Sequence, residues 1–300
     1  MPELPEVTTT VHGLNTVLPS LTITDVWSDY FLRTRSTSKN TIKNKKFFQY
    51  FKKEIIGEKV STIDRRGKNI LVRMKHGKTI LIHMKMTGHL LYGTYNFEKN
   101  VWHSDEPFLR DSFNQFIHLV FILSNGKHLA FSDMRKFAKV TLFETNKEHT
   151  MLDIQALGPE PLEYLSLPAF RTQLQKKPKG KIKTVLMDQT IFAGIGNIYS
   201  DEILWKAGIH PERMVSSLSN IEHEKIYTAM LFILKKSIKM GGDSMSDYRN
   251  IYGQKGSFQL AHKAYRRTGE KCERPKCSGT IRRKIVGGRS THFCDIHQTV

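Results

Sequence analysis

The chain begins with residues that could form a covalent bond to carbon, because Pro2 and Glu3 follow the initiator methionine. We expect the methionine to be removed, since a small second residue permits removal, and this would leave Pro2 as a free secondary amine. A terminal amine titrates near pH ~8, far below lysine, so a useful fraction is neutral and nucleophilic in a cell. An amine beside a carboxylic acid suits attack on a sugar or carbonyl carbon with formation of a Schiff base. An ordinary terminus with a proline before a helix would also fit these residues.

The three cysteines of the chain lie near its end, at Cys272, Cys277 and Cys294, and His297 follows the last of them. The spacing, Cys-x4-Cys and then Cys-x2-His, sets four soft or borderline ligands in two close pairs, as in tetrahedral structural zinc sites. An odd cysteine count argues against a disulfide framework. Four protein ligands leave no open position, so we expect one structural Zn²⁺. The alternative is three unrelated buried thiols and a surface histidine.

Between the two pairs, residues 280–293 are expected to form two strands that fold back at Gly287 and Gly288, with Arg289 at the turn. A metal-clamped hairpin of this kind would hold the arginine rigidly for entry into a groove. This hairpin with its metal ligands, here called the finger, would therefore present a cation as well as bind a metal.

Two other motifs could contact an anion. Arg65-Arg66-Gly67-Lys68 precedes a predicted strand, and Ala193-Gly-Ile-Gly-Asn197 opens a predicted helix. Small residues let the backbone approach a phosphate, and the first turn of a helix offers unpaired N–H groups. A solvated basic turn and simple helix punctuation remain the alternatives.

The net charge of +19, from 47 basic and 28 acidic residues, favours a polyanionic partner. The last 40 residues contribute ten Lys or Arg and three acids. A membrane surface would also attract a basic chain, but no segment approaches the ~20 apolar residues of a membrane span. No apolar stretch near the start suggests a secretory signal. We therefore expect a cytoplasmic protein that binds nucleic acid.

The first half of the chain must position the amino end and the Lys68 motif. We expect a short helix over 5–18, followed by β structure to about residue 146. Hairpins are predicted for 69–84 and 118–133, because alternating apolar runs flank turns rich in Gly, Asn and Lys. Regularly spaced short strands of this kind predict a sandwich or barrel. The stretches 36–53 and 92–114 show no clear period, and we interpret the second as a long loop without an assigned function.

The second half is predicted to be helical. Residues 157–162 (Leu-Gly-Pro-Glu-Pro-Leu) form a stiff connector, and 197–207 and 220–240 show helical spacing. Ser219 and Glu222 fit a capping box at the start of the second helix, and Gly241-Gly242 ends it. The length of 300 residues is consistent with two domains and a small appendage.

Taken together, these motifs resemble the formamidopyrimidine-DNA glycosylase family, bacterial base-excision enzymes that act on oxidised purines. The matching segments occur in family order and are residues 2–6, 66–68, 83–88, 133–137, 157–162, 188–199 and the terminal finger. The resemblance implies an α+β multidomain fold with an N-terminal β-sandwich domain and leading helix (1–150), a helix–two-turns–helix domain (151–262) and a zinc-finger hairpin (263–300). It also implies a monomer that binds damaged double-stranded DNA.

The resemblance further assigns roles. Pro2 matches the nucleophile and Glu3 the acid. Lys68 matches a lysine with a proton-donor and phosphate role, and Arg289 matches the finger arginine tied to δ-elimination. The remaining matches are the void-filling trio Met86, Arg135 and Phe137, the backbone-gripping Lys179, Lys183 and Asn197, and the supporting carboxylates Glu6 and Glu202. The implied reaction is base excision through a Schiff base followed by strand cleavage.

This chain departs from the family pattern in several places. The first cysteine pair is spaced by four residues rather than two, and His297 stands where a fourth cysteine is usual. Lys85 and Ala138 replace usual glycines. Phe116 stands where a DNA-contacting histidine is common, with His118 two residues on. Residues 242–256 align with the lesion-reading region, and their composition suits a mobile lid.

Two alternatives remain open. One is the related endonuclease VIII type, which prefers oxidised pyrimidines, although Leu4 and the trio favour the purine branch. The other is a non-catalytic zinc-ribbon DNA-binding protein that has kept the scaffold. The proline and carboxylates at the amino end argue against the second.

Overall fold

The computed structural model of the protein describes residues 1–32 and 39–299. The chain forms two compact units, Met1–Ile154 with Met240–Ser257, and Gln155–Lys239 with Phe258–Val300. A short segment from the second half of the chain thus belongs to the first unit. Of the unassigned stretch 36–53, residues 36–38 lie outside the described part.

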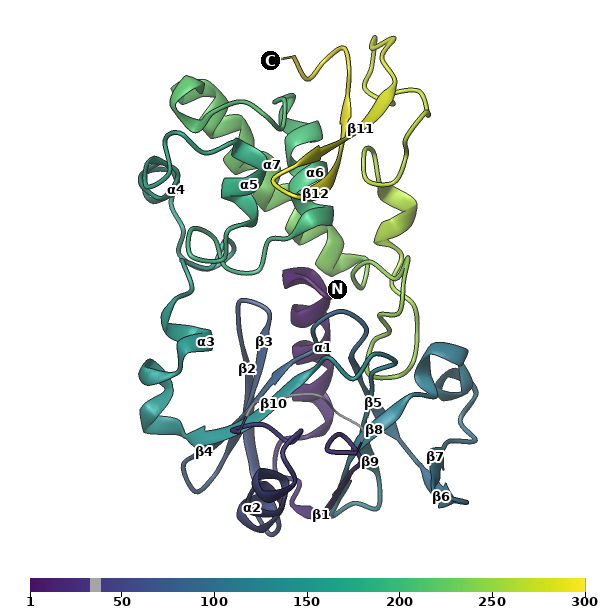
Figure 1. The fold of residues 1–300 in the computed structure, drawn as a ribbon. Helices are drawn as coiled ribbons and strands as arrows, with labels where there is room; N and C mark the ends of the chain where they lie inside the picture. Colours follow the sequence, from purple (N-terminus) through teal and green to yellow (C-terminus); the bar gives the residue numbers. More distant parts are fainter. Residues whose placement is uncertain (33–38, 300) are drawn as a thin grey trace. The chain divides into compact units, whose positions relative to one another are not determined.

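The first unit is a sandwich of two four-stranded antiparallel sheets (Figure 1), and the order of strands is β1-β8-β9-β5 in one and β10-β4-β3-β2 in the other. Apolar residues from both sheets meet in one core, because alternate side chains of each strand point inward. This confirms the predicted sandwich and both predicted hairpins. The strands are β1 (Ile23–Ser28), β2 (Val60–Arg66), β3 (Asn69–Met74), β4 (Lys78–His83), β5 (His89–Gly93), β8 (Ile117–Leu123), β9 (His128–Ser132) and β10 (Lys139–Glu144).

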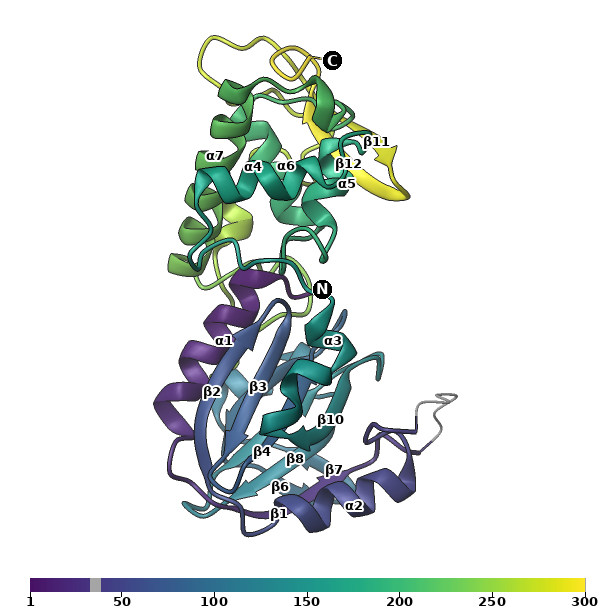
Figure 2. The same cartoon turned by 90° about the vertical axis from the view of Figure 1, so that its left-hand side faces the viewer.

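Helices close the sandwich at its margins. Helix α1 (Leu4–Val17) buries Val7, Val11 and Leu14 in the common core, and α2 (Lys45–Ile55) begins at an Asn44 cap. A small helix, α3 (Leu152–Gln155), follows the 3₁₀ turn η3 (Thr145–Thr150). Figure 2 shows α1 running along the edge of the sheet beside β2. The expected amino-terminal helix is therefore present with its apolar stripe facing the core.

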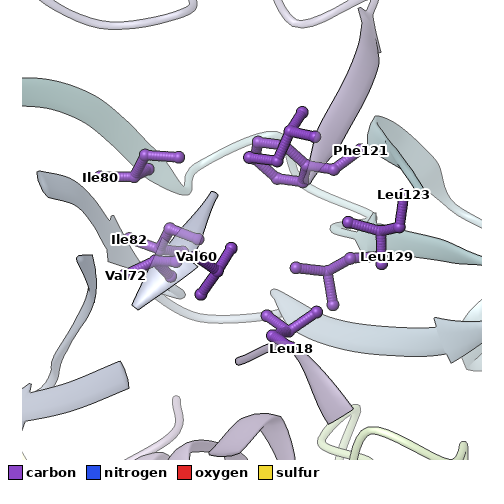
Figure 3. Close-up of a pocket in the computed structure, with 9 residues that line it drawn as sticks. Leu18, Val60, Val72, Ile80, Ile82, Phe121, Leu123 and Leu129 are labelled. Carbon is purple, nitrogen blue, oxygen red and sulfur yellow. The ribbon is translucent and has the colours of Figure 1, made fainter. Parts of the chain in front are cut away.

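A cavity of about 10 Å³ lies inside the sandwich (Figure 3). Its nine lining residues are all aliphatic or aromatic: Leu18, Ile23, Val60, Val72, Ile80, Ile82, Phe121, Leu123 and Leu129. Such a volume is barely that of one water molecule, and this lining offers a water no partner. The cavity is a gap in packing and not a ligand site.

The stretch 92–114, interpreted from sequence as a long loop, is structured. It contains a small hairpin and two 3₁₀ turns, namely β6 (Asn96–Glu98), β7 (Val101–His103), η1 (Pro107–Arg110) and η2 (Ser112–Asn114). Tyr95, Trp102 and Leu109 form a second core with Leu91 and Val120 on the outer face of the first sheet. The loop interpretation was wrong because strands of three residues are too short to show a period, and their burial comes from distant partners.

The second unit consists of helices and one hairpin. The helices are α4 (Leu167–Gln175), α5 (Ile182–Met187), α6 (Asn197–Ala207) and α7 (Asn220–Lys239), with 3₁₀ turns η4 (Val215–Ser217) and η5 (Phe258–Ala261). The predicted capping box is confirmed, since Ser219 N donates to Glu222 at 2.8 Å and Glu222 N donates to Ser219 Oγ at 3.3 Å. The terminal hairpin pairs β11 (Ile281–Val286) with β12 (Arg289–Cys294) through the turn Gly287-Gly288, as predicted.

Within the described ranges 1–32 and 39–299, the helices include none with both the length and the apolar character that crossing a membrane requires.

Candidate active site

The amino end lies at the start of α1, with Pro2 buried and Glu3 only 3% exposed. Glu3 N donates to the Glu6 carboxylate at 2.7 Å, so the first helical turn fixes the backbone of the two leading residues. A helix N-terminus carries a partial positive charge, which disfavours a protonated amine and favours nearby carboxylates. The predicted nucleophile and its acid are therefore held by α1 rather than by a frayed terminus.

Lys68 lies in the two-residue turn between β2 and β3. Arg66 pairs with Asn69, which leaves Gly67 and Lys68 as the turn, and Gly67 has φ 59°. Glycine is needed at this first turn position of a type II′ hairpin, because a side chain would be strained there. In both Figures 1 and 2 this turn lies at the same end of the sandwich as the first residues of the chain.

The expected void-filling trio comes together. The guanidinium of Arg135 donates to Met86 Sδ at 3.1 Å, and its Cζ lies 4.3 Å from the centre of the Phe137 ring. Met86 and Phe137 are 40% and 47% exposed, which is unusual for large apolar side chains. These two wedges and the arginine form one exposed cluster built from two loops.

Asp133, to which the sequence assigned no role, holds these two loops together. Its buried carboxylate accepts from Thr87 Oγ1 at 2.5 Å, Tyr30 Oη at 2.9 Å and Ala138 N at 2.8 Å. Thr87 Oγ1 in turn accepts from Arg135 N at 3.2 Å. The signal was available, because Asp133 opens the matched segment 133–137.

Lys85 has φ 55°, in the left-handed region that glycine adopts without strain. A lysine at this position, where the family usually has glycine, therefore carries a cost in backbone strain. Lys85 N donates to His83 Nδ1 at 3.0 Å. Burial, and then the charges of Lys85 and Lys68, lower the pKa of His83 to about 3. His83 is therefore neutral at physiological pH beside two lysines.

His118 does not take the place of the missing family histidine. Its Nδ1 lies 2.9 Å from Asp29, which also pairs with Lys136 at 2.9 Å. Phe116 is 37% exposed and offers an apolar ring instead. Position 116 therefore offers no imidazole, and the imidazole of His118 is paired with Asp29.

In the second unit, Arg289 lines a concavity of about 670 Å³. Asn197, at the start of α6, lines the same concavity and donates through Nδ2 to Ser290 O at 3.0 Å, which ties the hairpin to the helix. Arg266 and Arg283 also line it, although the sequence had marked them only as part of a basic tail. Three guanidinium groups around one concavity are suited to bind the phosphates of a nucleic-acid backbone.

Lys183, expected to grip the DNA backbone, is placed differently. Its side chain is 0% exposed, and its ammonium bonds Asp201 at 2.6 Å and Asn197 O at 2.9 Å. Asp201 also accepts from His292 N at 3.0 Å, on strand β12. The Lys183 ammonium is therefore engaged inside the protein, because a buried cation needs its internal partner. Lys179 is exposed, as a phosphate contact requires.

Glu202, an expected supporting carboxylate, is wholly buried and accepts three backbone N–H groups, from Lys263, Ala264 and Tyr265, at 2.8–3.1 Å. Burial raises the pKa of Glu202, against the lowering effect of His262 and of these bonds. The turn that Glu202 organises leads directly to Arg266. Glu202 therefore fixes the backbone next to Tyr265 and Arg266, which line the concavity.

The four predicted metal ligands come together. The ligand atoms of Cys272, Cys277, Cys294 and His297 all lie within 4.8 Å of one another, the one such group with a cysteine among residues 1–32 and 39–299. Cys277 Sγ lies 3.6 Å from Cys294 Sγ, and His297 Nδ1 lies 3.3 Å from Cys272 Sγ and 3.7 Å from Cys277 Sγ. A tetrahedron with Zn–S bonds of about 2.3 Å has edges of about 3.8 Å, so the set fits zinc.

Helix α6 orients this set. His297 Nε2 donates to Trp205 O at 3.1 Å, which leaves Nδ1 free of a proton and facing the sulfurs. Trp205 Nε1 donates to Cys272 Sγ at 3.4 Å. The altered spacing of the first cysteine pair and the histidine in place of a fourth cysteine are therefore compatible with one closed site.

Comparison with known proteins agrees with this geometry. The family descriptions "Formamidopyrimidine-DNA glycosylase N-terminal domain" and "Formamidopyrimidine-DNA glycosylase H2TH domain" match residues 1–140 and 157–249. The formamidopyrimidine-DNA glycosylase of Pelotomaculum thermopropionicum is 35% identical over the whole of both chains, and that of Herpetosiphon aurantiacus is 36% identical over 99% of this chain and 100% of its own.

Solved structures are similar as well. The Lactococcus lactis Fpg, in complex with DNA that contains an abasic site, has a TM-score of 0.82 and 31% identity, covering 99% of this chain and 100% of that one. MutM in complex with carbocyclic 8-oxo-G DNA has a TM-score of 0.81 and 32% identity, with full coverage of both chains. With two family domains matched and full-length relatives above 30% identity, the chain belongs to the formamidopyrimidine-DNA glycosylase family of DNA repair enzymes.

Proposed function

We propose that this protein excises oxidised purines from duplex DNA and then cleaves the strand as an abasic-site lyase. The observation that carries the proposal is the buried Pro2–Glu3 pair at the start of α1, at the same end of the sandwich as the Lys68 turn. The related structures bound to DNA with an abasic site or 8-oxo-G support this substrate class.

In the proposed reaction, the neutral nitrogen of processed Pro2 attacks C1′ of the damaged nucleotide. The C1′–N9 bond breaks and its electrons leave with the base, which takes a proton from water, while the Glu3 carboxylate takes up the proton that the Pro2 nitrogen releases. Glu3 protonates O4′ as the sugar ring opens, which gives an iminium between Pro2 and C1′. The iminium acidifies the C2′ protons, so loss of one expels the 3′ phosphate in β-elimination. A second elimination expels the 5′ phosphate and leaves a one-nucleotide gap.

Other residues serve binding and proton transfer in this proposal. Lys68 donates a proton and holds a phosphate near the lesion, and Arg289 holds the flanking phosphates during the second elimination. Lys179 and Asn197 contact the DNA backbone. Glu6 and Glu202 act indirectly, by fixing the backbone around Glu3 and around Arg266.

Removal of a base from duplex DNA requires the nucleotide to leave the stack. We infer that Met86 and Phe137 fill the space it leaves, while Arg135 hydrogen-bonds the orphaned base. Their exposure and mutual contact support this, since apolar side chains of a purely structural cluster would be buried.

One Zn²⁺ held by Cys272, Cys277, Cys294 and His297 would supply structural stability to the hairpin that carries Arg289, and no chemistry. In this proposal residues 1–150 form the catalytic region, 151–262 the helical DNA-binding region and 263–300 the finger. The protein would act as a monomer in the cytoplasm.

The decisive experiment is borohydride reduction during incubation with a duplex that contains 8-oxoguanine. A covalent protein–DNA adduct is expected, and replacement of Pro2 should abolish it. No adduct with the unmodified protein would favour a non-catalytic DNA-binding protein. Intact-mass measurement should show loss of Met1, because a retained methionine or an acetyl group would block the nucleophile.

Lesion preference needs a separate comparison, because an endonuclease VIII-type enzyme would form the same adduct. Duplexes with 8-oxoguanine and with thymine glycol are cleaved in parallel. Faster cleavage of the first supports the purine branch, to which Leu4 and the trio belong.

A further inference from the structure

The segment 104–114, to which no role was assigned above, contacts the segment 242–256 through an ion pair between the partly exposed Asp111 and the buried Arg249. Arg249 is 1% exposed, and its guanidinium donates to both carboxylate oxygens of Asp111 at 3.2 Å. Its Cζ also lies 4.8 Å from the centre of the Phe113 ring. Two further donations, to Ser246 O at 3.0 Å and Tyr248 O at 2.9 Å, satisfy the remaining face of the guanidinium.

A backbone amide in its own segment orients Asp111 for this contact. Its Oδ1 accepts from Phe113 N at 2.9 Å, which caps the turn η2. Although partial burial acts in the opposite direction, the Phe113 amide and the Arg249 charge together lower the pKa of Asp111. A buried arginine with a single carboxylate partner is strongly dependent on that partner, because an unpaired buried charge is costly.

Further contacts join residues 92–114 to residues 242–256. Ile251 is buried in the main core, and its carbonyl accepts from Tyr92 N at 2.6 Å. Asn114 donates to Gly253 O at 3.4 Å, and a Cβ on Gly253 would lie 2.5 Å from Phe108 O. The backbone of 249–253 is thus fitted closely against 92–114 (Figure 1).

The same segment also touches the amino-terminal helix. Asp243 N donates to the Glu6 carboxylate at 2.8 Å, the same carboxylate that receives Glu3 N. Tyr248 Oη donates to Glu6 O at 3.0 Å. Residues 243–253 therefore bridge the backbone of the proposed catalytic residues and the 104–114 segment.

We infer that the Asp111–Arg249 pair is a positioning device, which holds residues 242–256 in the conformation that presents them to the everted base. The inference rests on the proposed function and on the alignment of this segment with the lesion-reading region of the family. It gives the 104–114 segment a purpose, namely to brace residues 242–256. Arg249 and Asp111 touch no reacting atom and act through the backbone between them.

The test separates base reading from strand cleavage. Asp111→Asn and Arg249→Met variants are compared with the unmodified protein on two duplexes, one with 8-oxoguanine and one with a preformed abasic site. We expect excision of 8-oxoguanine in single turnovers to fall about tenfold or more, as for loss of roughly 1.4 kcal/mol of positioning. Cleavage of the abasic duplex should stay within about twofold, because no base is read there.

Hydrogen exchange and a conservative variant complete the test. Amides of 249–254 should exchange faster in both variants, while those of β3 and β8 remain protected. Arg249→Lys, which keeps the charge without the bidentate fork, should give an intermediate excision rate. The matched control is Asp105→Asn, since Asp105 pairs with Arg110 in the same segment at 2.8 Å but is exposed, and it should change neither rate.

Unchanged excision despite faster exchange would overturn the inference, and so would an equal loss on both duplexes, which would indicate a general structural defect. If the unmodified protein cleaves neither duplex, the proposed function itself fails and the inference falls with it. That outcome is distinct from a failure of the pair alone, in which the unmodified protein and both variants are equally active.

Discussion

The Lys183 ammonium and the Asp201 carboxylate form a wholly buried ion pair with a separation of 2.6 Å. The second carboxylate oxygen of Asp201 binds the backbone and ring of His292, on the strand that Arg289 begins. A residue expected at the DNA surface is therefore a structural support for the hairpin that carries the proposed phosphate contact.

Lys183→Met should destabilise the second unit, because it leaves the Asp201 charge buried without its cation. The expected loss is about 3–5 kcal/mol of unfolding free energy, measured by chemical denaturation. Lys179→Met is the matched comparison, since this lysine is exposed. It should leave the unfolding free energy unchanged and reduce the slope of log affinity against log salt by about one unit. Equal stability of the two variants would contradict the buried-pair interpretation.

Arg289→Ala should weaken DNA binding and depress strand cleavage, because one guanidinium leaves the concavity. Loss of a charged hydrogen bond of about 1.5–3 kcal/mol corresponds to roughly ten- to a hundredfold in affinity. Arg282 lies on the same hairpin, is 62% exposed and pairs with Asp295, so Arg282→Ala serves as control. If cleavage of an abasic duplex by Arg289→Ala is unchanged, the finger has another role.

Removal of one metal ligand should release zinc. We expect His297→Ala to lose the metal, and His297→Cys to retain one ion per chain by elemental analysis, because Cys₄ sites also bind zinc tetrahedrally. Chelation should open the hairpin and shift the fluorescence of Trp205, which contacts both Cys272 and His297. His149→Ala, on an exposed turn, should keep the metal. Zinc retained by His297→Ala would exclude this histidine as a ligand.

Stability should rise with pH across the titration of His83. Burial and the neighbouring lysines lower its pKa from 6.5 to about 3, so between these values the unfolded chain binds a proton that the folded chain does not. The free energy of unfolding therefore increases as pH rises through this window and the gain is complete above the unfolded pKa. His83→Gln should flatten this dependence in denaturation experiments between pH ~4 and ~7. An identical slope in the variant would show that other groups cause it.

Much of the local structure was determined by short-range pattern. Helices α6 and α7 and the hairpin β11–β12 were predictable, because the helical period, the Ser219 capping box of α7 and the Gly287-Gly288 turn each depend on residues close together in sequence. The metal ligands were predictable for the same reason, since each pair lies within one turn of chain. The amino end was read correctly as a helix start because Pro5 and Glu6 belong to its first turn.

Long-range contacts decided the rest. The burial of Lys183 depends on Asp201, 18 residues on, and the partner of that carboxylate, His292, lies 91 residues beyond it. Asp111 and Arg249 are 138 residues apart. A charged residue that ends in the interior has the same local pattern as one at the surface, because only the tertiary fold supplies the counter-charge that makes burial possible. The sequence by itself therefore determined the helix start at the amino end and the four clustered ligands of the finger, whereas the tertiary structure decided which cations face solvent and which are buried in ion pairs.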